Sequence, residues 1–205
     1  MLKYSHKAKR RLLMYQITNE PKRFKIDVLP WPNEYPVKYD TFVDFSYDEG
    51  GFKLHFVSYE TNIRKVETEH NTEVCCDSCV EFFAQFNYPA DKNYLNFEVN
   101  PNGAMLVGCQ EGRGSGKHAL AEDIDTLGIT PEIFEDRWEV TYYVTKEFIK
   151  KYIPSYEHKK GNGIRANFYK CGDETENTHY VAFNNVLTPE PDFHRPEYFV
   201  EFELA

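Results

Sequence analysis

The sequence lacks three features that would assign it to other classes of protein: a long apolar run, an excess of positive charge and a segment of biased composition. No run approaches the roughly 20 apolar residues that a membrane-spanning helix needs. The first 13 residues have no apolar signal-peptide core. A net charge of -9 offers no basic surface to a nucleic-acid backbone. We therefore expect a cytoplasmic protein that binds neither membranes nor nucleic acids.

Cysteine is also scarce, with five residues at positions 75, 76, 79, 109 and 171. An odd number without framework spacing does not indicate a set of disulfides. If Cys76 and Cys79 shared a strand, their side chains would point to opposite faces and could not readily coordinate the same metal ion. We therefore expect buried free thiols.

What the sequence does contain is apolar and aromatic side chains, at 41% and 16% of 205 residues. Aromatic rings pack well on pleated sheets and are enriched in strands. No Pro-rich or Gly-rich linker divides the chain. This composition predicts one domain over residues 14–205, preceded by a flexible basic extension over residues 1–13.

Alternating apolar residues predict an all-β protein, an antiparallel sandwich of immunoglobulin-like or jelly-roll-like type. One short helix is expected over Lys146–Tyr152, with Thr145 as its N-cap. Residues 111–137 are polar at first, and we expect a long loop there with little regular structure. The predicted strands are Thr41–Tyr47, Phe52–Tyr59, Cys79–Phe86, Tyr94–Asn100, Ala104–Gln110, Glu139–Val144, Ile164–Cys171, His179–Phe183 and Phe199–Leu204.

Two of these strands carry a glutamate in the middle, within the stretches DSCVEFF (residues 77–83) and NFEVN (residues 96–100). If the strands are antiparallel neighbours, one register puts the apolar residues of both on the same face. That register places Glu81 directly opposite Glu98. The two carboxylates are therefore predicted to be cross-strand neighbours.

Like charges directly opposite each other destabilise a sheet, so the pair needs an explanation. A cation or an arginine between them, ligand hydroxyls that donate to both, or a shared proton would each supply one. Asn96 and Asn100 lie on the same predicted face as Glu98, which suits a hydroxyl-rich ligand. The alternative is a solvated face whose glutamates pair with surface lysines such as Lys53.

Three motifs carry a resemblance to a known family: the DSCVEFF stretch, the run Tyr94-x-Asn96-Phe97-Glu98-x-Asn100 with Gly103, and the closing FHRPEYF of residues 193–199. Together they resemble the family 9-like carbohydrate-binding modules, a DOMON-like β-sandwich group, in its intracellular stand-alone branch. The resemblance covers the chain from about Met14 to its end and implies a non-catalytic binding module.

In the sugar-binding members, as the resemblance implies, two tryptophans clamp a sugar while charged side chains accept its hydroxyls. The acidic position of that site matches Glu81. The two tryptophan positions fall at about Cys75 and at Phe193, and the position of Glu98 is basic in sugar binders. The chain therefore resembles the family in fold more closely than in its sugar site.

Other side chains are candidates to complete such a site. Trp31 and Trp138 could replace the clamp, although each also suits a packing role. Arg113 follows a predicted strand and could reach the glutamate pair. His194 and Arg195 lie in a Pro-bounded loop that could rim the site.

The leading hypothesis is therefore binding of a saccharide or related polyol, with calcium as an additional ligand that carboxylate oxygens suit. A retaining glycosidase is an alternative, because its two carboxyls lie about 5–5.5 Å apart. Haem binding through Met105 and a histidine is another, and a protein-interaction module is a third. The predicted ligand-binding residues are Trp31, Glu81, Asn96, Glu98, Asn100, Arg113, Phe193, His194 and Arg195.

Overall fold

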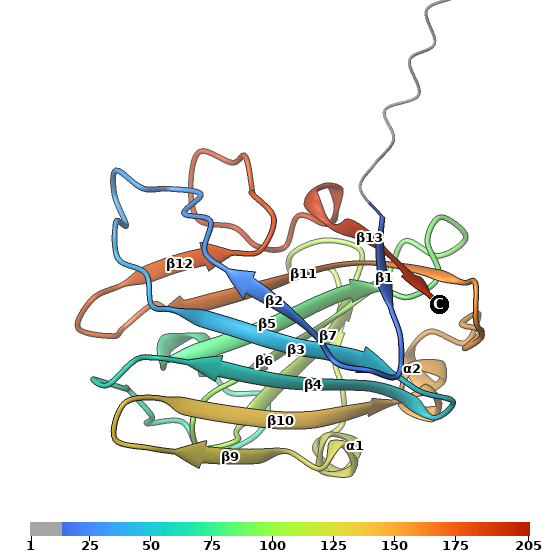
Figure 1. Ribbon diagram of the computed structural model, residues 1–205, viewed down its shortest axis with the longest axis horizontal. Coiled ribbons are helices and arrows are strands. Elements are labelled where there is room, and N and C mark those ends of the chain that lie inside the picture. The colour runs from blue at the N-terminus through green and yellow to red at the C-terminus, as the bar shows by residue number, and fades with distance from the viewer. Residues whose placement is uncertain (1–13) are drawn as a thin grey trace, which may run out of the picture.

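The computed structural model describes residues 14–205, so the predicted extension over residues 1–13 lies outside the described residues. The described chain forms two β-sheets packed face to face (Figure 1). The predicted all-β sandwich is thereby confirmed. Because its strands alternate apolar and polar residues, each sheet has an apolar face to bury against the other.

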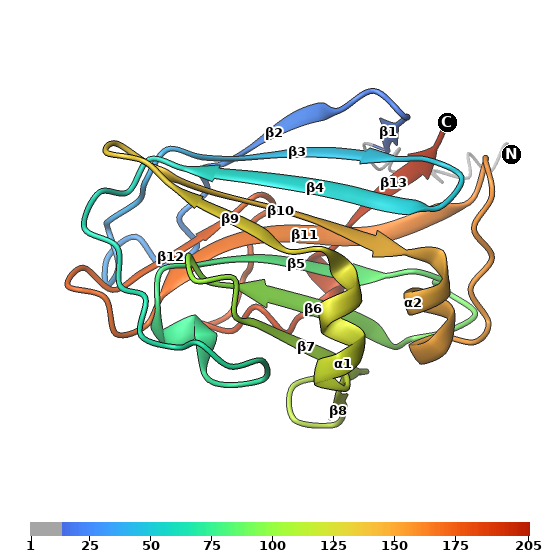
Figure 2. The ribbon, with the colours of Figure 1, turned by 90° about the horizontal axis from the view of Figure 1, so that it is seen from below.

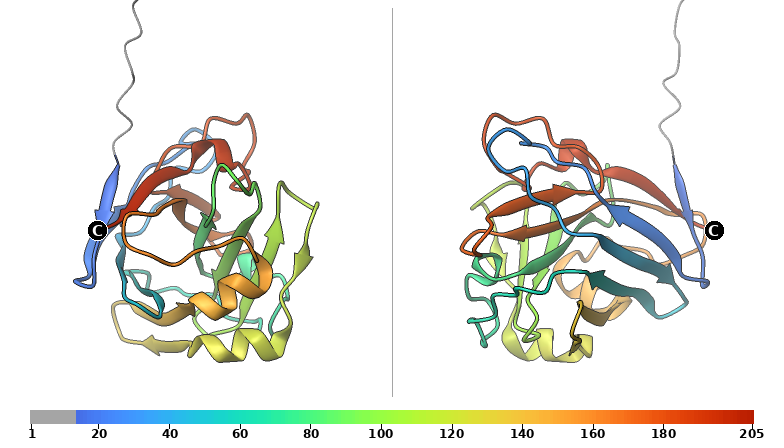
Figure 3. Two further views of the ribbon diagram at one scale, coloured as in Figure 1. Left: turned by 90° about the vertical axis from the view of Figure 1, so that its right-hand side faces the viewer. Right: turned by 60° about the vertical axis from the view of Figure 1, so that its left-hand side comes forward.

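The larger sheet contains eight strands within the described residues: β1 (Tyr15–Ile17), β5 (Cys79–Gln85), β6 (Tyr94–Val99), β7 (Met105–Gln110), β8 (Lys117–His118), β11 (Gly163–Gly172), β12 (His179–Ala182) and β13 (Val200–Leu204). Their order is β1-β13-β11-β5-β6-β7-β8, with β12 paired to β11. Strand β1 runs parallel to β13, so the two ends of the described chain lie side by side (Figure 3).

The smaller sheet has the order β2-β3-β4-β10-β9. Its strands are β2 (Lys22–Ile26), β3 (Thr41–Tyr47), β4 (Gly51–Ser58), β9 (Thr130–Ile133) and β10 (Trp138–Thr145). In β10 every second side chain is buried, which is the pattern of a strand with one face on a core. Trp138 is one of these buried side chains, as its packing role predicted.

Helices are few and short. Helix α2 (Lys146–Tyr152) has the predicted bounds, and its N-cap Thr145 accepts a hydrogen bond from the backbone of Phe148 at 3.0 Å. Helix α1 (Ala121–Ile124) lies at the same end of the sandwich (Figure 2), where its Asp123 pairs with Lys151. Three 3-10 turns complete the set: η1 (Val74–Cys76), η2 (Asp125–Leu127) and η3 (Pro196–Tyr198). Within residues 14–205, no helix has the length and apolarity needed to cross a bilayer.

All nine predicted strands are present, and their ends shift by at most one residue. The expectation of little regular structure over residues 111–137 was wrong, because that segment contains β8, α1, η2 and β9. Strands β1 and β2 were also missed. All four of these missed strands are short, and β9 carries a proline, which only an edge strand tolerates. Their formation depends on partners elsewhere in the chain.

The main core lies between the two sheets and is rich in phenylalanine. Phe82 from β5 and Phe168 from β11 stack at a centroid distance of 5.4 Å, and Phe45 of the opposite sheet contacts both. Met105 is fully buried in this core. The haem hypothesis would require the core to open around Met105, so the packing does not favour it.

The outer face of the larger sheet is covered as well. Every residue of β5 and β6 is buried, on both faces of the sheet. A second apolar cluster lies on this face. The segment between β12 and β13, residues 183–199, which we call the covering segment, contributes Val186, Phe193 and Phe199 to it. The prediction of a solvated glutamate face is therefore wrong, and Lys53 lies on β4 in the other sheet.

A buried ion pair lies at one end of the sandwich. The Lys170 ammonium is 3.0 Å from a carboxylate oxygen of Glu60, and both side chains are fully buried. Ser78 and Trp138 donate to the same carboxylate, and His179 lies 2.7 Å from the ammonium. Burial acts to raise the pKa of Glu60, but Lys170, His179 and Ser78 together outweigh it, and the pKa lies below its ordinary value.

We predict that Glu60→Gln lowers the free energy of unfolding by about 3–5 kcal/mol, because it leaves the Lys170 charge buried without a counter-charge. Urea denaturation at neutral pH measures the change. Glu157→Gln, which removes the exposed partner of Lys159, is the matched control and should leave the midpoint unchanged. Equal losses of unfolding free energy in the two variants would show that the buried ion pair contributes no more to stability than the exposed one.

Candidate functional site: an acidic cavity on the larger sheet

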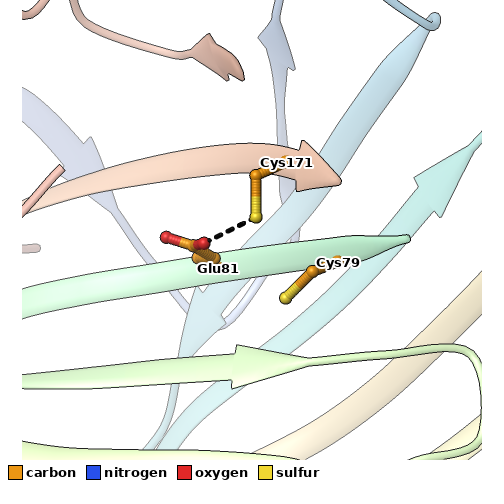
Figure 4. A group of neighbouring side chains, drawn as sticks. All are labelled: Cys79, Glu81 and Cys171. Atoms are coloured by element: carbon orange, nitrogen blue, oxygen red, sulfur yellow. Dashed lines mark hydrogen bonds between the residues drawn. The ribbon is translucent and has the colours of Figure 1, made fainter. Parts of the chain in front are cut away.

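The predicted register between the two glutamate-bearing strands is confirmed. Strands β5 and β6 pair so that Glu81 lies opposite Glu98, and the apolar residues on either side of each also face one another. On its other edge β5 pairs with β11, which places Cys171 opposite Cys79. Figure 4 shows Glu81 and Cys79 on one strand and Cys171 on its neighbour.

Above these strands lies a cavity of about 170 Å³. Its floor includes Glu81, Glu98 and Cys171, and η1 contributes Cys75. Its volume is below the range of about 300–1,000 Å³ typical of sites for drug-sized ligands. The cavity therefore has room for one small ring or group.

One wall of the cavity is apolar and comes from Tyr180 of β12 and from Pro191 and Phe193 of the covering segment. The Phe193 ring stacks on Tyr169 with a centroid distance of 4.0 Å and an interplanar angle of 13°. Trp31 packs against Phe193 and donates its indole N–H to the Thr188 carbonyl at 2.7 Å. Trp31 thus supports the wall from outside and does not line the cavity, in contrast to its predicted ligand-binding role.

The rim carries charge. Arg113, from the loop after β7, donates to the Asp192 carboxylate at 3.2 Å. The His194 ring lies 2.8 Å from the Tyr94 hydroxyl, and burial lowers the pKa of His194 to about 4. His194 therefore stays neutral at physiological pH and anchors the covering segment to β6.

Burial dominates the electrostatics of the floor. It raises the pKa of Glu81 well above the ordinary value, and the neighbouring Glu98 raises it further. Burial also raises the pKa of Glu98 to about 7, although the Asn96 amide donates to its Oε1 at 2.9 Å. The pKa of Asp173, which also lines the cavity, is raised by burial as well.

Hydrogen bonding leaves one floor atom unsatisfied. The Cys171 thiol donates to Glu81 Oε1 at 2.9 Å (Figure 4), whereas Glu81 Oε2 is buried and has no partner among the described residues. Buried polar atoms are almost always hydrogen-bonded, so an exception calls for an explanation.

A second hollow of about 240 Å³ adjoins the first and shares Cys75, Glu98, Arg113 and His194 with it. Asn96 lines this hollow, next to Gly108 on β7. A Cβ at position 108 would lie 2.6 Å from the Asn96 amide oxygen, so glycine gives that amide its space. Six predicted site residues thus line one or both hollows: Glu81, Asn96, Glu98, Arg113, Phe193 and His194.

Two further predicted site residues lie elsewhere. The Asn100 side chain is fully buried and bonds to Asp77 and to the backbone of its own turn. Arg195 pairs with Glu197 at 3.3 Å and lies outside both hollows. Asn100 thus stabilises the turn after β6, and Arg195 stabilises the end of the covering segment.

The thiols only partly match expectation. Cys79 and Cys171 are buried, but Cys75, Cys76 and Cys109 are partly exposed. Cys76 lies in η1, so the assumption that it shares a strand with Cys79 was wrong. Ligand atoms of Cys79, Glu81 and Cys171 all lie within 4.8 Å of one another, a grouping that sequence spacing did not suggest.

Sequence reasoning also missed Asp173, Tyr180 and Asp192. Asp173 follows the last residue of β11, and Tyr180 lies on β12, which pairs with β11 next to it. Of the three, only Asp192 could have been suspected from the sequence, because it immediately precedes the FHRPEYF motif. Their convergence results from strand pairing that the sequence does not display.

We predict that Glu98→Gln stabilises the protein at pH 8 by on the order of 1–3 kcal/mol and has little effect at pH 4.5. A carboxyl with a raised folded-state pKa contributes stability that is present below its unfolded pKa. That stability is lost as pH rises to about 7. Urea unfolding at several pH values measures the difference.

Glu132→Gln, on the exposed edge strand β9, is the control and should track the wild type at every pH. A constant offset between Glu98→Gln and wild type across the pH range would refute the assignment of a raised pKa to Glu98.

The fold and the lined cavity define a ligand-binding type of β-sandwich, with its cavity on the outer face of one sheet. The model of carbohydrate-binding family 9 matches residues 12–204, and the chain therefore belongs to that family. A search of curated proteins finds no significant match.

Solved structures share the architecture. A crystal structure of a candidate carbohydrate-binding protein from Bacteroides uniformis ATCC 8492 is similar with a TM-score of 0.83 and 22% identity, over 94% of this chain and 97% of that one. A family 9 module from Caldicellulosiruptor kristjanssonii in complex with glucose has a TM-score of 0.61 and 11% identity, over 94% and 95% of the chains. The module from that organism in complex with cellotriose has a TM-score of 0.61 and 12% identity, over 93% of each chain. At these identities the likeness establishes the fold.

Proposed function

We propose that the protein binds a saccharide, without converting it, in the acidic cavity of the larger sheet. One observation carries the proposal: in a chain of carbohydrate-binding family 9, apolar side chains and buried carboxyls line one cavity sized for a single ring. Membership of the family supports a saccharide as the class of ligand, and the lining of the cavity supports it as the place of binding.

The two surfaces suit the two sides of a sugar. The C–H face of a pyranose is apolar and packs on aromatic rings such as Phe193 and Tyr180. Its hydroxyls are hydrogen-bond donors, and the buried carboxylates of Glu81 and Glu98 are acceptors. Because both carboxylates are shielded from water, each such hydrogen bond is stronger than it would be at the surface.

The position of the cavity also agrees with the site that the family resemblance implies. Cys75 and Phe193, which occupy the two tryptophan positions, both line it. A thiol and a phenyl ring replace two large aromatics, so we propose that the sugar stacks on one side only and meets carboxylates on the other.

A glycosidase function is the weaker proposal. In a retaining mechanism one of two carboxyls must be ionised to act as nucleophile while the other carries a proton. Here burial raises the pKa of both Glu81 and Glu98. The environment therefore does not keep one carboxyl ionised as the nucleophile and the other protonated as the acid.

We predict that Phe193→Leu weakens saccharide binding about tenfold, because leucine keeps the apolar packing but removes the flat ring face. Isothermal titration calorimetry against glucose, glucosamine and short oligosaccharides, with calcium and with a chelator, measures the affinity. The control is Phe134→Leu, since Phe134 is an exposed ring between β9 and β10, away from the cavity.

Absence of heat and of a thermal shift with every saccharide would refute the proposed function. Release of sugar from aryl glycosides, abolished in Glu81→Gln, would instead establish an enzyme. Equal weakening in both phenylalanine variants would remove the cavity from consideration as the site.

A further inference from the structure

The acidic end of the cavity holds carboxyl groups whose ionised forms are not balanced by a nearby cation. Three of its carboxylates, on Glu81, Glu98 and Asp173, have no lysine, arginine or histidine nitrogen within 4.0 Å among residues 14–205. The cation of the lining, Arg113, is 65% exposed and is engaged with Asp192 at the rim. A buried anion without a partner is costly, so this end of the cavity is suited to a cation.

The unsatisfied oxygen gives that cation a location. Glu81 is 3% exposed and lines the cavity, and its Oε2 is buried without a hydrogen-bond partner among the described residues. Its other oxygen is already engaged by the Cys171 thiol at 2.9 Å. Glu98 similarly uses one oxygen to accept from Asn96. Hydrogen-bond donors on a ligand would therefore supply partners for the second oxygen of each carboxylate.

An ammonium group meets this requirement better than a neutral hydroxyl. It carries three N–H donors and a positive charge, so it can bond to several carboxylates at once. A sugar hydroxyl offers one donor and no charge, so it would not stabilise the ionised forms of these carboxyls in the same way. The cavity also retains an apolar wall for a ring at Tyr180, Pro191 and Phe193.

We propose that the preferred ligand is an amino sugar with a free amine, whose ammonium lies between Glu81, Glu98 and Asp173 while its ring packs on Phe193. This inference rests on the proposed saccharide binding and names the class of saccharide. An N-acetylated sugar lacks the charge and is disfavoured by the same argument.

A metal ion is the competing occupant, held by Cys79, Glu81 and Cys171. Cys79 lies on the same face as Glu81 but is fully buried and does not line the cavity. Both thiols would have to lose their protons, and burial among carboxylates raises the pKa of Cys79 to about 11. An ammonium needs no such deprotonation, which favours the amino sugar.

The pH dependence distinguishes a charged from a neutral ligand. The titratable or charged groups around the Glu81–Glu98 pair and in the two hollows are Glu73, Cys75, Cys79, Arg113, Lys117, His118, Cys171, Asp173, Tyr180, Asp192 and His194. Burial raises the pKa of Glu98 to about 7 and that of Glu81 well above its ordinary value. Ionisation of the pair therefore increases as the pH rises, and affinity for an ammonium should rise from pH 5 to pH 7. It should fall again where the amine itself deprotonates, near about pH 8 by analogy with α-amino groups.

The test is calorimetric titration of the full chain with glucosamine, glucose and N-acetylglucosamine at pH 5, 6, 7 and 8, with a chelator present. At pH 7 we expect glucosamine to bind about ten- to a hundredfold more tightly than glucose. In Glu81→Gln this preference should largely disappear, because glucosamine loses more affinity than glucose when the carboxylate charge is removed. Glu132→Gln is the matched control on an exposed strand and should keep the preference.

Asp173→Asn provides a second variant and should reduce the preference in part. Thermal unfolding of each variant checks that it is folded. Protonation linkage is a separate readout: at pH 6 glucosamine binding should release protons to the buffer, and glucose binding should release fewer.

Each alternative outcome has a distinct meaning. Equal or tighter binding of glucose in the wild type would overturn the amino-sugar inference and leave saccharide binding intact. No binding of any sugar would overturn the proposed function and the inference with it. Zinc or calcium binding that Glu81→Gln abolishes, with no response to glucosamine, would assign the acidic end to a metal ion.

Discussion

The pairing of β5 between β6 and β11 is the constraint on which the rest of the structure depends. Because side chains alternate along a strand, one register puts Phe82 into the core and Glu81 onto the opposite face. The same pairing sets Glu98 on one side of Glu81 and brings Cys171 onto the same face. A slip of one residue would reverse core and site together, so the apolar core and the acidic cavity are determined by a single set of backbone hydrogen bonds.

The covering segment turns this polar face into a site. It places Phe193 on Tyr169 and leaves β5 and β6 buried on both sides. Removing water from Glu81 and Glu98 makes their ionised forms unfavourable, which is why their pKa values rise. The same exclusion of water makes them strong acceptors for a ligand. Burying these unpaired carboxyls lowers the stability of the fold at neutral pH but prepares them to bind a ligand. Glu60 and Lys170, at the end of the core, differ because each buried charge has a partner.

The nine strands, α2 and the Glu81–Glu98 register were predictable because each rests on a local pattern: alternation, an N-cap or a matched apolar face. Strands β1, β2, β8 and β9 were not, since short edge strands are held by their partners. The site was predictable in part. The paired glutamates followed from register, whereas Trp31, Asn100 and Arg195 are engaged in packing, a turn and an ion pair that the sequence does not reveal.

The sequence by itself determined the sandwich, the family and the pairing of two carboxylates, because alternation with period two and short motifs are readable along the chain. Only the tertiary structure decided that the outward face is buried, that Asp173 and Tyr180 join it, and that Glu81 Oε2 has no partner among the described residues. The reason is separation along the chain. Cys171, which donates to Glu81, lies 90 residues away, and contacts over such distances depend on how the sheets and loops pack.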